Sequence, residues 1–130
     1  FTLLALDGQD AERWNMLNPA STTPRLAYVT QCLAGSEGPV IAATDYMRTY
    51  AEQIRAFIPK GRGYKVLGTD GFGRSDTRAK LREFFEVNRY FVTIAALKTL
   101  AEAGSIDVAV VTRAIEKYGI DSNKPNPVTQ

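Results

Sequence analysis

One glycine-punctuated segment carries the side chains best suited to bind a charged ligand or partner. It reads Gly68-Thr-Asp-Gly-Phe-Gly-Arg-Ser-Asp76 and follows a short apolar run. An arginine guanidinium suits paired contacts to carboxylate or phosphate, and aspartates nearby would complete an exposed charged surface. We therefore expect a candidate interface or ligand loop made of Asp70, Phe72, Arg74, Ser75 and Asp76.

A purely structural role for the same loop is the main alternative. Gly71 and Gly73 would permit positive φ angles, Phe72 would anchor the loop in a pocket, and Ser75 or Asp76 would cap the next helix. The known phosphate-binding loops are disfavoured because Gly71-Phe-Gly73 is followed by Arg-Ser-Asp-Thr, which matches neither the Walker spacing nor the dinucleotide fingerprint.

The chain contains no histidine, which removes the commonest general base and transition-metal ligand. Cys32 lacks a histidine partner and is expected to be a small buried hydrophobe. Asp7, Asp10 and Glu12 crowd one turn, where they could bind a cation but more simply favour the start of a helix. We assign no catalytic, cofactor-binding or metal-binding residue.

The composition indicates one α/β domain with no nucleic-acid footprint. The formal net charge is only +2, and the charges alternate in sign between residues 78 and 86. No apolar run is long enough to span a membrane. The single cysteine points to a reducing cytoplasm.

Hydrophobic spacing predicts the elements that position the loop. Short apolar runs predict strands, helical spacing of apolar residues predicts helices, and Gly or Pro separates them. The expected strands cover residues 1–6, 40–43 and 65–67, and the expected helices cover residues 10–17, 25–33, 45–57, 77–85, 88–103 and 107–118. These elements predict an α/β fold with a small, mostly parallel sheet and flanking helices. Cys32 and the candidate loop lie outside the expected strands.

The chain also begins inside an apolar run, at Phe1. We expect residues 1–130 to form most of one domain that is incomplete at its N-terminal side, with residues 120–130 as an irregular tail.

Three stretches carry a resemblance to a known family. They are Asp7-Gly-Gln-Asp-Ala-Glu-Arg-Trp-Asn-Met-Leu-Asn-Pro19, Thr44-Asp-Tyr-Met-Arg-Thr-Tyr-Ala-Glu-Gln53 and Val66-Leu-Gly-Thr-Asp-Gly-Phe-Gly-Arg-Ser-Asp-Thr-Arg78. In this order they resemble the C-terminal domain of the homodimeric bacterial pyruvate dehydrogenases, and more distantly that of transketolases. The resemblance implies a transketolase C-terminal-domain-like fold.

The resemblance also implies thiamine diphosphate and Mg²⁺, bound by other domains of the intact enzyme. The family's cofactor motif begins Gly-Asp-Gly and ends in asparagine, whereas this chain has Thr69-Asp-Gly71 and Asn88 comes too soon. No cofactor is therefore expected in this stretch. The implied reaction is decarboxylation of pyruvate and transfer of the two-carbon unit to a lipoyl group.

By this resemblance the 130 residues are a structural, dimer-supporting domain that is inactive alone. Implied partners are the other domains of the chain, a second subunit of the homodimer and the lipoyl acyltransferase component. Two alternatives stay open: the C-terminal domain of a transketolase or another 2-oxoacid dehydrogenase, and a stand-alone module that binds a partner.

Overall fold

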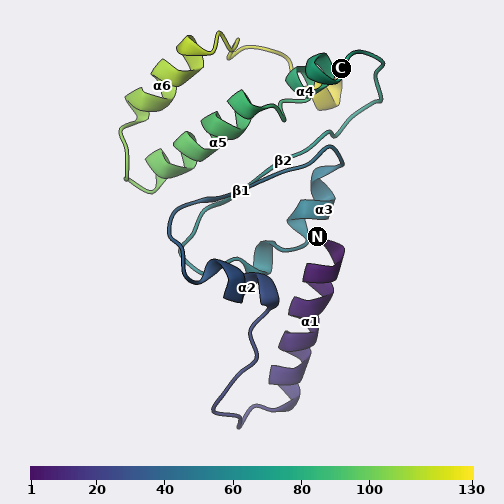
Figure 1. Cartoon of the computed structure of the whole chain (residues 1–130), viewed down its shortest axis with the longest axis vertical. Helices are drawn as coiled ribbons and strands as arrows, with labels where there is room; N and C mark the ends of the chain where they lie inside the picture. The colour runs from purple at the N-terminus through teal and green to yellow at the C-terminus, as the bar shows by residue number, and fades with distance from the viewer.

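The computed structural model describes residues 1–130 as three layers, with two strands between two groups of helices (Figure 1). The elements are α1 (Thr2–Leu17), α2 (Tyr28–Leu33), β1 (Val40–Ala43), α3 (Arg48–Glu52), a 3-10 turn (Arg55–Phe57), β2 (Tyr64–Leu67), α4 (Arg78–Phe84), α5 (Arg89–Glu102), α6 (Val108–Lys117) and a second 3-10 turn (Pro127–Thr129). Helices α1, α2 and α3 lie on one side of the strands, and α5 and α6 on the other. The expected α/β class is confirmed.

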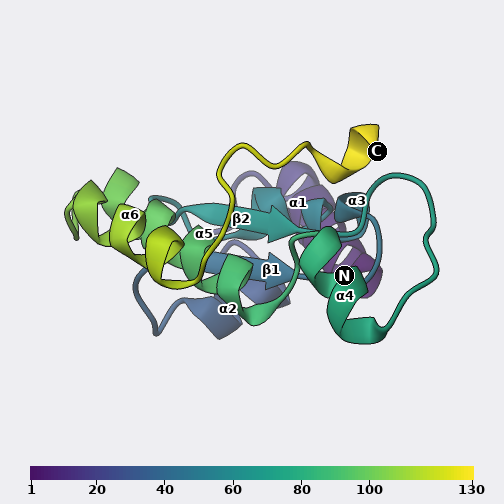
Figure 2. The ribbon, with the colours of Figure 1, turned by 90° about the horizontal axis from the view of Figure 1, so that it is seen from above.

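The two strands pair in parallel, and the register places Val40 beside Tyr64 and Ala43 beside Leu67. Figure 2 shows both arrows pointing the same way, so their carboxyl ends deliver the following loops to one edge of the sheet. Ligand sites of parallel α/β folds usually lie at that edge. The crossover from β1 to β2 contains α3, as the sequence predicts.

The strand expected over residues 1–6 is wrong, because those residues begin α1. The helix is sixteen residues long and buries Ala5, Gly8 and Ala11. These small residues recur every three positions and let α1 approach the ring of Phe57, whereas Leu3 and Leu6 stay exposed. The sheet therefore has two strands, not three.

The helix expected over residues 45–57 is also shorter than predicted. Helix α3 ends at Glu52, and a 3-10 turn follows. The carbonyl of Ala51 accepts a hydrogen bond from the Tyr64 hydroxyl at 2.6 Å, and a second from the Ile54 amide. The bond from the Ile54 amide spans three residues, as in a 3-10 turn, and takes the place of the α-helical bond that would continue the ladder.

The main core lies between the sheet and the layer formed by α1, α2 and α3. Its buried members are Ala5, Ala27, Val29, Ala51, Ile54, Phe57, Ile58, Tyr64 and Val66. Cys32 is exposed, which corrects the prediction of a buried thiol. Helix α2 buries Val29 instead, whereas Cys32 stays exposed.

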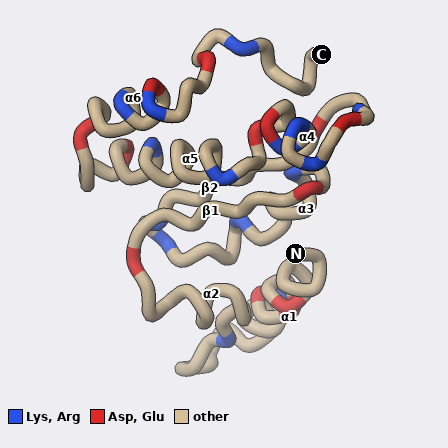
Figure 3. The backbone as a smooth tube through the Cα atoms, turned by 45° about the horizontal axis from the view of Figure 1, so that its top comes forward, with Lys and Arg blue, Asp and Glu red and all other residues tan.

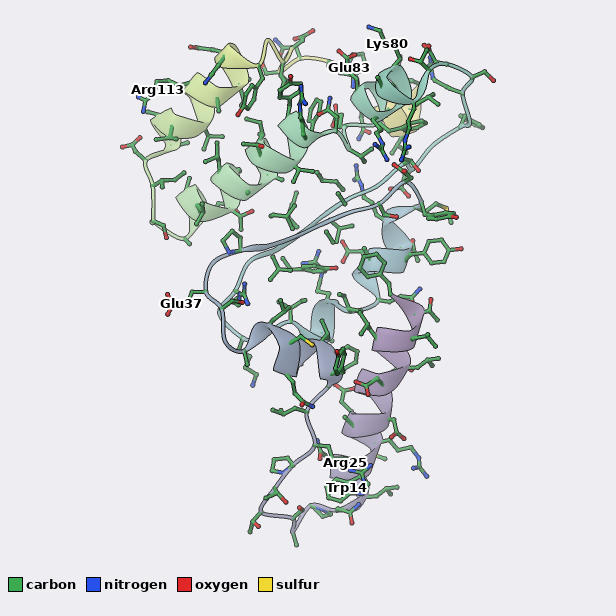
Figure 4. All side chains as sticks on the ribbon, in the orientation of Figure 1. Trp14, Arg25, Glu37, Lys80, Glu83 and Arg113 are labelled. Carbon is green, nitrogen blue, oxygen red and sulfur yellow. The ribbon has the colours of Figure 1, made fainter.

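The far end of α1 is closed by the loop that follows it. The guanidinium of Arg25 lies 4.4 Å from the centre of the Trp14 ring, and Asn15 exchanges two hydrogen bonds with the Arg25 backbone. Figure 4 shows Trp14 and Arg25 together at this end, away from the sheet.

The tail returns to the second helical layer. The ammonium of Lys124 donates to the carbonyl oxygens of Phe84 at 2.7 Å and Glu83 at 3.2 Å, at the end of α4. Residues 120–130 contain only a short 3-10 turn, and Pro127 within it is buried. None of the helices combines the length and the apolar character that crossing a membrane requires.

Candidate functional site

The candidate loop leaves β2 at the carboxyl edge of the sheet and enters α4. Thr69 fixes its start, because its amide donates to the Tyr46 carbonyl at 2.9 Å and its hydroxyl donates to the Asp45 carbonyl at 2.7 Å. The loop after β1 and the loop after β2 are therefore held together. Every residue from Gly71 to Lys80 is exposed.

Asp70 faces Arg48 rather than Arg74. The Arg48 Nε atom lies 3.3 Å from Asp70 Oδ2 as an ion pair without an aligned hydrogen bond, and the Arg48 amide donates to the same oxygen at 3.4 Å. The Asp70 carboxylate thus fastens the loop to the start of α3. Asp70 is therefore engaged within the fold, although it was expected to complete an exposed charged surface beside Arg74.

Phe72 does not anchor the loop in a pocket, which corrects the structural reading of this residue. Its side chain is 78% exposed at the tip of the loop. Gly71 supplies the anchor through its backbone: its φ is +112°, and a Cβ there would lie 3.0 Å from the Pro127 carbonyl oxygen. The loop is therefore held by close backbone packing against the tail, and the Phe72 ring is left in solvent.

Arg74, Ser75 and Asp76 lead into α4. The Arg74 guanidinium stacks 3.9 Å from the centre of the Phe84 ring. The cap of α4 is Thr77, whose hydroxyl accepts from the Lys80 amide at 3.4 Å, so the expected caps Ser75 and Asp76 are wrong. Asp76 instead accepts a hydrogen bond from the Thr77 amide at 2.7 Å.

Two charged residues at this edge escaped the sequence analysis. Arg82 on α4 binds Asp45 in the loop after β1, with Nη2 3.0 Å from Oδ2. The hydrogen bond from Arg82 lowers the pKa of the Asp45 carboxyl, and the charge of Arg78 acts in the same direction. No local spacing signals this pair, since its partners are far apart in the sequence and meet only when α4 packs at the sheet edge.

Figure 3 shows acidic and basic residues gathered along α4 and the loop before it. They surround a surface cavity of about 480 Å³, lined by Asp45, Thr69, Gly71, Phe72, Gly73, Arg74, Asp76, Arg78, Leu81, Arg82 and Phe85. The cavity brings together three of the five candidate residues: Phe72, Arg74 and Asp76 line it, whereas Asp70 and Ser75 do not.

Residues 6–88, more than half of the chain, match the family described as the transketolase-like TK C-terminal domain. The chain belongs to this family. The resemblance inferred from the sequence motifs is thereby confirmed, and so is the transketolase C-terminal-like fold.

Transketolase-like C-terminal domains similar to this one occur in bacterial proteins named pyruvate dehydrogenase E1 component. The chain is 60% identical to that of Cupriavidus necator over 99% of its own length. It is 58% identical to the protein of Pseudomonas aeruginosa and 54% identical to that of Escherichia coli K12, each over 98% of its length. The chain spans 14% of the length of each relative.

The Thr69-Asp-Gly71 string does not fit the cofactor motif of thiamine diphosphate enzymes, because its polar side chains are engaged within the fold. Asp70, the only acidic residue of the Thr69-Asp-Gly71 string, is already paired with Arg48, and the Thr69 hydroxyl is bonded to the Asp45 carbonyl. No group of three or more acidic or cysteine side chains is placed to hold a metal ion. What the site offers chemically is recognition of charge.

Proposed function

We propose that the chain is part of a thiamine-diphosphate-dependent pyruvate dehydrogenase of the acetyl-transferring type. The intact enzyme would decarboxylate pyruvate and reductively acetylate a lipoyl group. The observation that carries the proposal is identity of 54 to 60% to three proteins named pyruvate dehydrogenase E1 component, sustained over nearly all of the chain.

Within that enzyme the proposed role of this domain is structural support. Helix α1 supports this role, because several of its apolar side chains are exposed although the helix is otherwise packed on the core. The exposed fractions are 81% for Leu3, 55% for Leu6, 70% for Met16 and 57% for Leu17. Apolar surface of this kind is typical of an interface, and we assign it to contact with other domains of the same polypeptide or with the second subunit of a homodimer.

The chemistry then belongs to residues outside this chain. Thiamine diphosphate and Mg²⁺ would be bound by the other domains, and the lipoyl group would be presented by the acyltransferase component of the complex, in the cytoplasm. This domain supplies no group to the reacting atoms. The 130 residues alone are accordingly expected to be inactive.

The test compares the intact polypeptide that carries this chain with the 130 residues alone. Both are given pyruvate, thiamine diphosphate and Mg²⁺, and CO₂ release and acetylation of a lipoyl domain are measured. We expect turnover only from the intact polypeptide. Turnover by the 130 residues would overturn the structural role, and an intact polypeptide that transfers two-carbon units between sugars but ignores pyruvate would favour the transketolase alternative.

A further inference from the structure

The cavity at the carboxyl edge of the sheet is lined by two cationic side chains that have no acidic partner in the chain, although the Arg74 guanidinium stacks on the Phe84 ring. Arg74 and Arg78 both line the cavity, and neither guanidinium forms an ion pair or a hydrogen bond within the chain. Arg82 beside them is neutralised by Asp45. A pair of unpaired guanidiniums in one concave surface is a ready receptor for an anionic group.

The backbone of the loop adds further donors. The amide groups of Gly71, Phe72, Gly73 and Arg74 donate no hydrogen bond to any backbone or side-chain acceptor of the chain. Successive free amides in a turn attract anions even without side chains. The loop residues that carry these amides line the same cavity as Arg74 and Arg78.

The remaining lining of the cavity restricts the kind of ligand. The exposed ring of Phe72 offers a flat apolar surface beside the cationic groups. Asp76 also lines the cavity and adds one negative charge, although it accepts a hydrogen bond from the Thr77 amide. A volume of about 480 Å³ suits a small organic molecule rather than a bare ion.

A larger cavity of the molecule lacks these features. It has a volume of about 720 Å³ and lies between α4, the start of α5 and the tail. Three of its polar side chains are engaged within the chain: Lys124 binds the carbonyls at the end of α4, Asn88 caps α5, and Arg89 donates to the Tyr90 hydroxyl. The smaller cavity, in contrast, is lined by two arginines without an ion pair.

We propose that the cavity between the loop Gly71–Arg74 and the start of α4 binds a small ligand through a phosphate or carboxylate group. Arg74 and Arg78 hold the anionic group together with the loop amides, and Phe72 contacts an adjoining flat part of the ligand. The site is separate from the decarboxylation chemistry proposed above and does not depend on it.

The test measures hydrogen exchange of the peptide that spans residues 68–77 in the intact polypeptide, because a site-resolved signal excludes anion binding elsewhere. The probes are phenyl phosphate, benzoate and inorganic phosphate. We expect phenyl phosphate or benzoate to slow exchange of the loop amides, and whichever protects at lower concentration identifies the anionic group. Inorganic phosphate should act more weakly, since it cannot contact Phe72.

Two arginine variants and a matched control decide the outcome. Arg74→Gln and Arg78→Gln should each raise the probe concentration needed for half-protection about tenfold, as loss of a charge-assisted hydrogen bond predicts. Arg113→Gln should leave it unchanged, because Arg113 is an exposed, unpaired arginine that points outward from α6, away from the loop (Figure 4). Circular dichroism confirms that each variant is folded.

The proposal would be overturned if none of the three probes protected the loop. It would also be overturned if Arg113→Gln weakened the protection as much as Arg74→Gln and Arg78→Gln do. Pyruvate turnover is measured separately on the unmodified polypeptide. Failure of anion binding and failure of the dehydrogenase proposal therefore give different results.

Discussion

Gly8 is held in the middle of α1 by the ring of Phe57. A Cβ at this position would lie 2.6 to 2.7 Å from three carbon atoms of that ring, which is buried. Gly8→Ala should lower the free energy of unfolding by about 1–3 kcal/mol through overpacking, partly offset by up to about 1 kcal/mol of helix propensity. Urea unfolding measures the change.

The control for this substitution is the background Phe57→Leu, in which the ring is gone. There, Gly8→Ala should be neutral or stabilising, because only the propensity gain remains. Equal costs in the two backgrounds would show that the ring of Phe57 does not require the glycine.

Tyr64 connects β2 to α3 through its hydroxyl, which donates to the Ala51 carbonyl at 2.6 Å. Burial raises the pKa of the Tyr64 phenol from 10.0 to about 12. Since the unfolded chain loses this proton first, stability is fully present below about pH 10 and falls as the pH rises toward 12. The phenolate absorbance of the folded chain should therefore show that Tyr64 titrates late, near pH 12.

Tyr64→Phe should remove that late step and lower the free energy of unfolding by about 1 kcal/mol at neutral pH, the typical net contribution of a hydrogen bond. If the Tyr64→Phe variant still shows a step near pH 12 in its absorbance titration, that step belongs to another tyrosine.

At the scale of elements, local chemistry predicted the second half of the chain well. Asn88 and Asp107 begin helices at the positions expected, because each short polar side chain accepts hydrogen bonds from the first turn. The first half was harder to predict. Residues 1–6 have the apolar run of a buried strand, yet they form the start of α1, a helix that packs its Gly8 against the ring of Phe57.

Helix α5 should depend on its cap, because it packs against both strands and starts at Asn88. The Asn88 Oδ1 atom accepts from the amides of Tyr90 and Phe91, each at 3.1 Å. Asn88→Ala should lower the free energy of unfolding by about 0.5–2 kcal/mol, whereas Asn88→Ser should retain most of the stabilisation that the cap provides. Similar losses for both variants in urea unfolding would mean that the cap contributes through packing instead.

At the scale of the whole molecule, the sequence motifs predicted the family and the position of the candidate loop, but not the pairing of its charges. Asp70 turns to Arg48, and the Arg82 partner Asp45 comes from the loop after β1. These pairings depend on how α3 and α4 meet at the sheet edge, which no local pattern encodes. For the same reason, no local pattern predicts that Arg74 and Arg78 form no ion pair.

The exposed apolar side of α1 leads to a prediction for the isolated chain. Leu3 and Leu6 are 81% and 55% exposed, on the side of the helix away from Ala5 and Gly8. Because this surface is available to a second copy, the 130 residues alone should self-associate in light scattering as their concentration rises. The double variant Leu3→Lys and Leu6→Lys should restore a monomer, whereas Val108→Lys, at a residue that is 61% exposed on α6, should not. A wild-type chain that stays monomeric at every concentration would instead favour the stand-alone, partner-binding alternative over a domain whose α1 is covered in a larger enzyme.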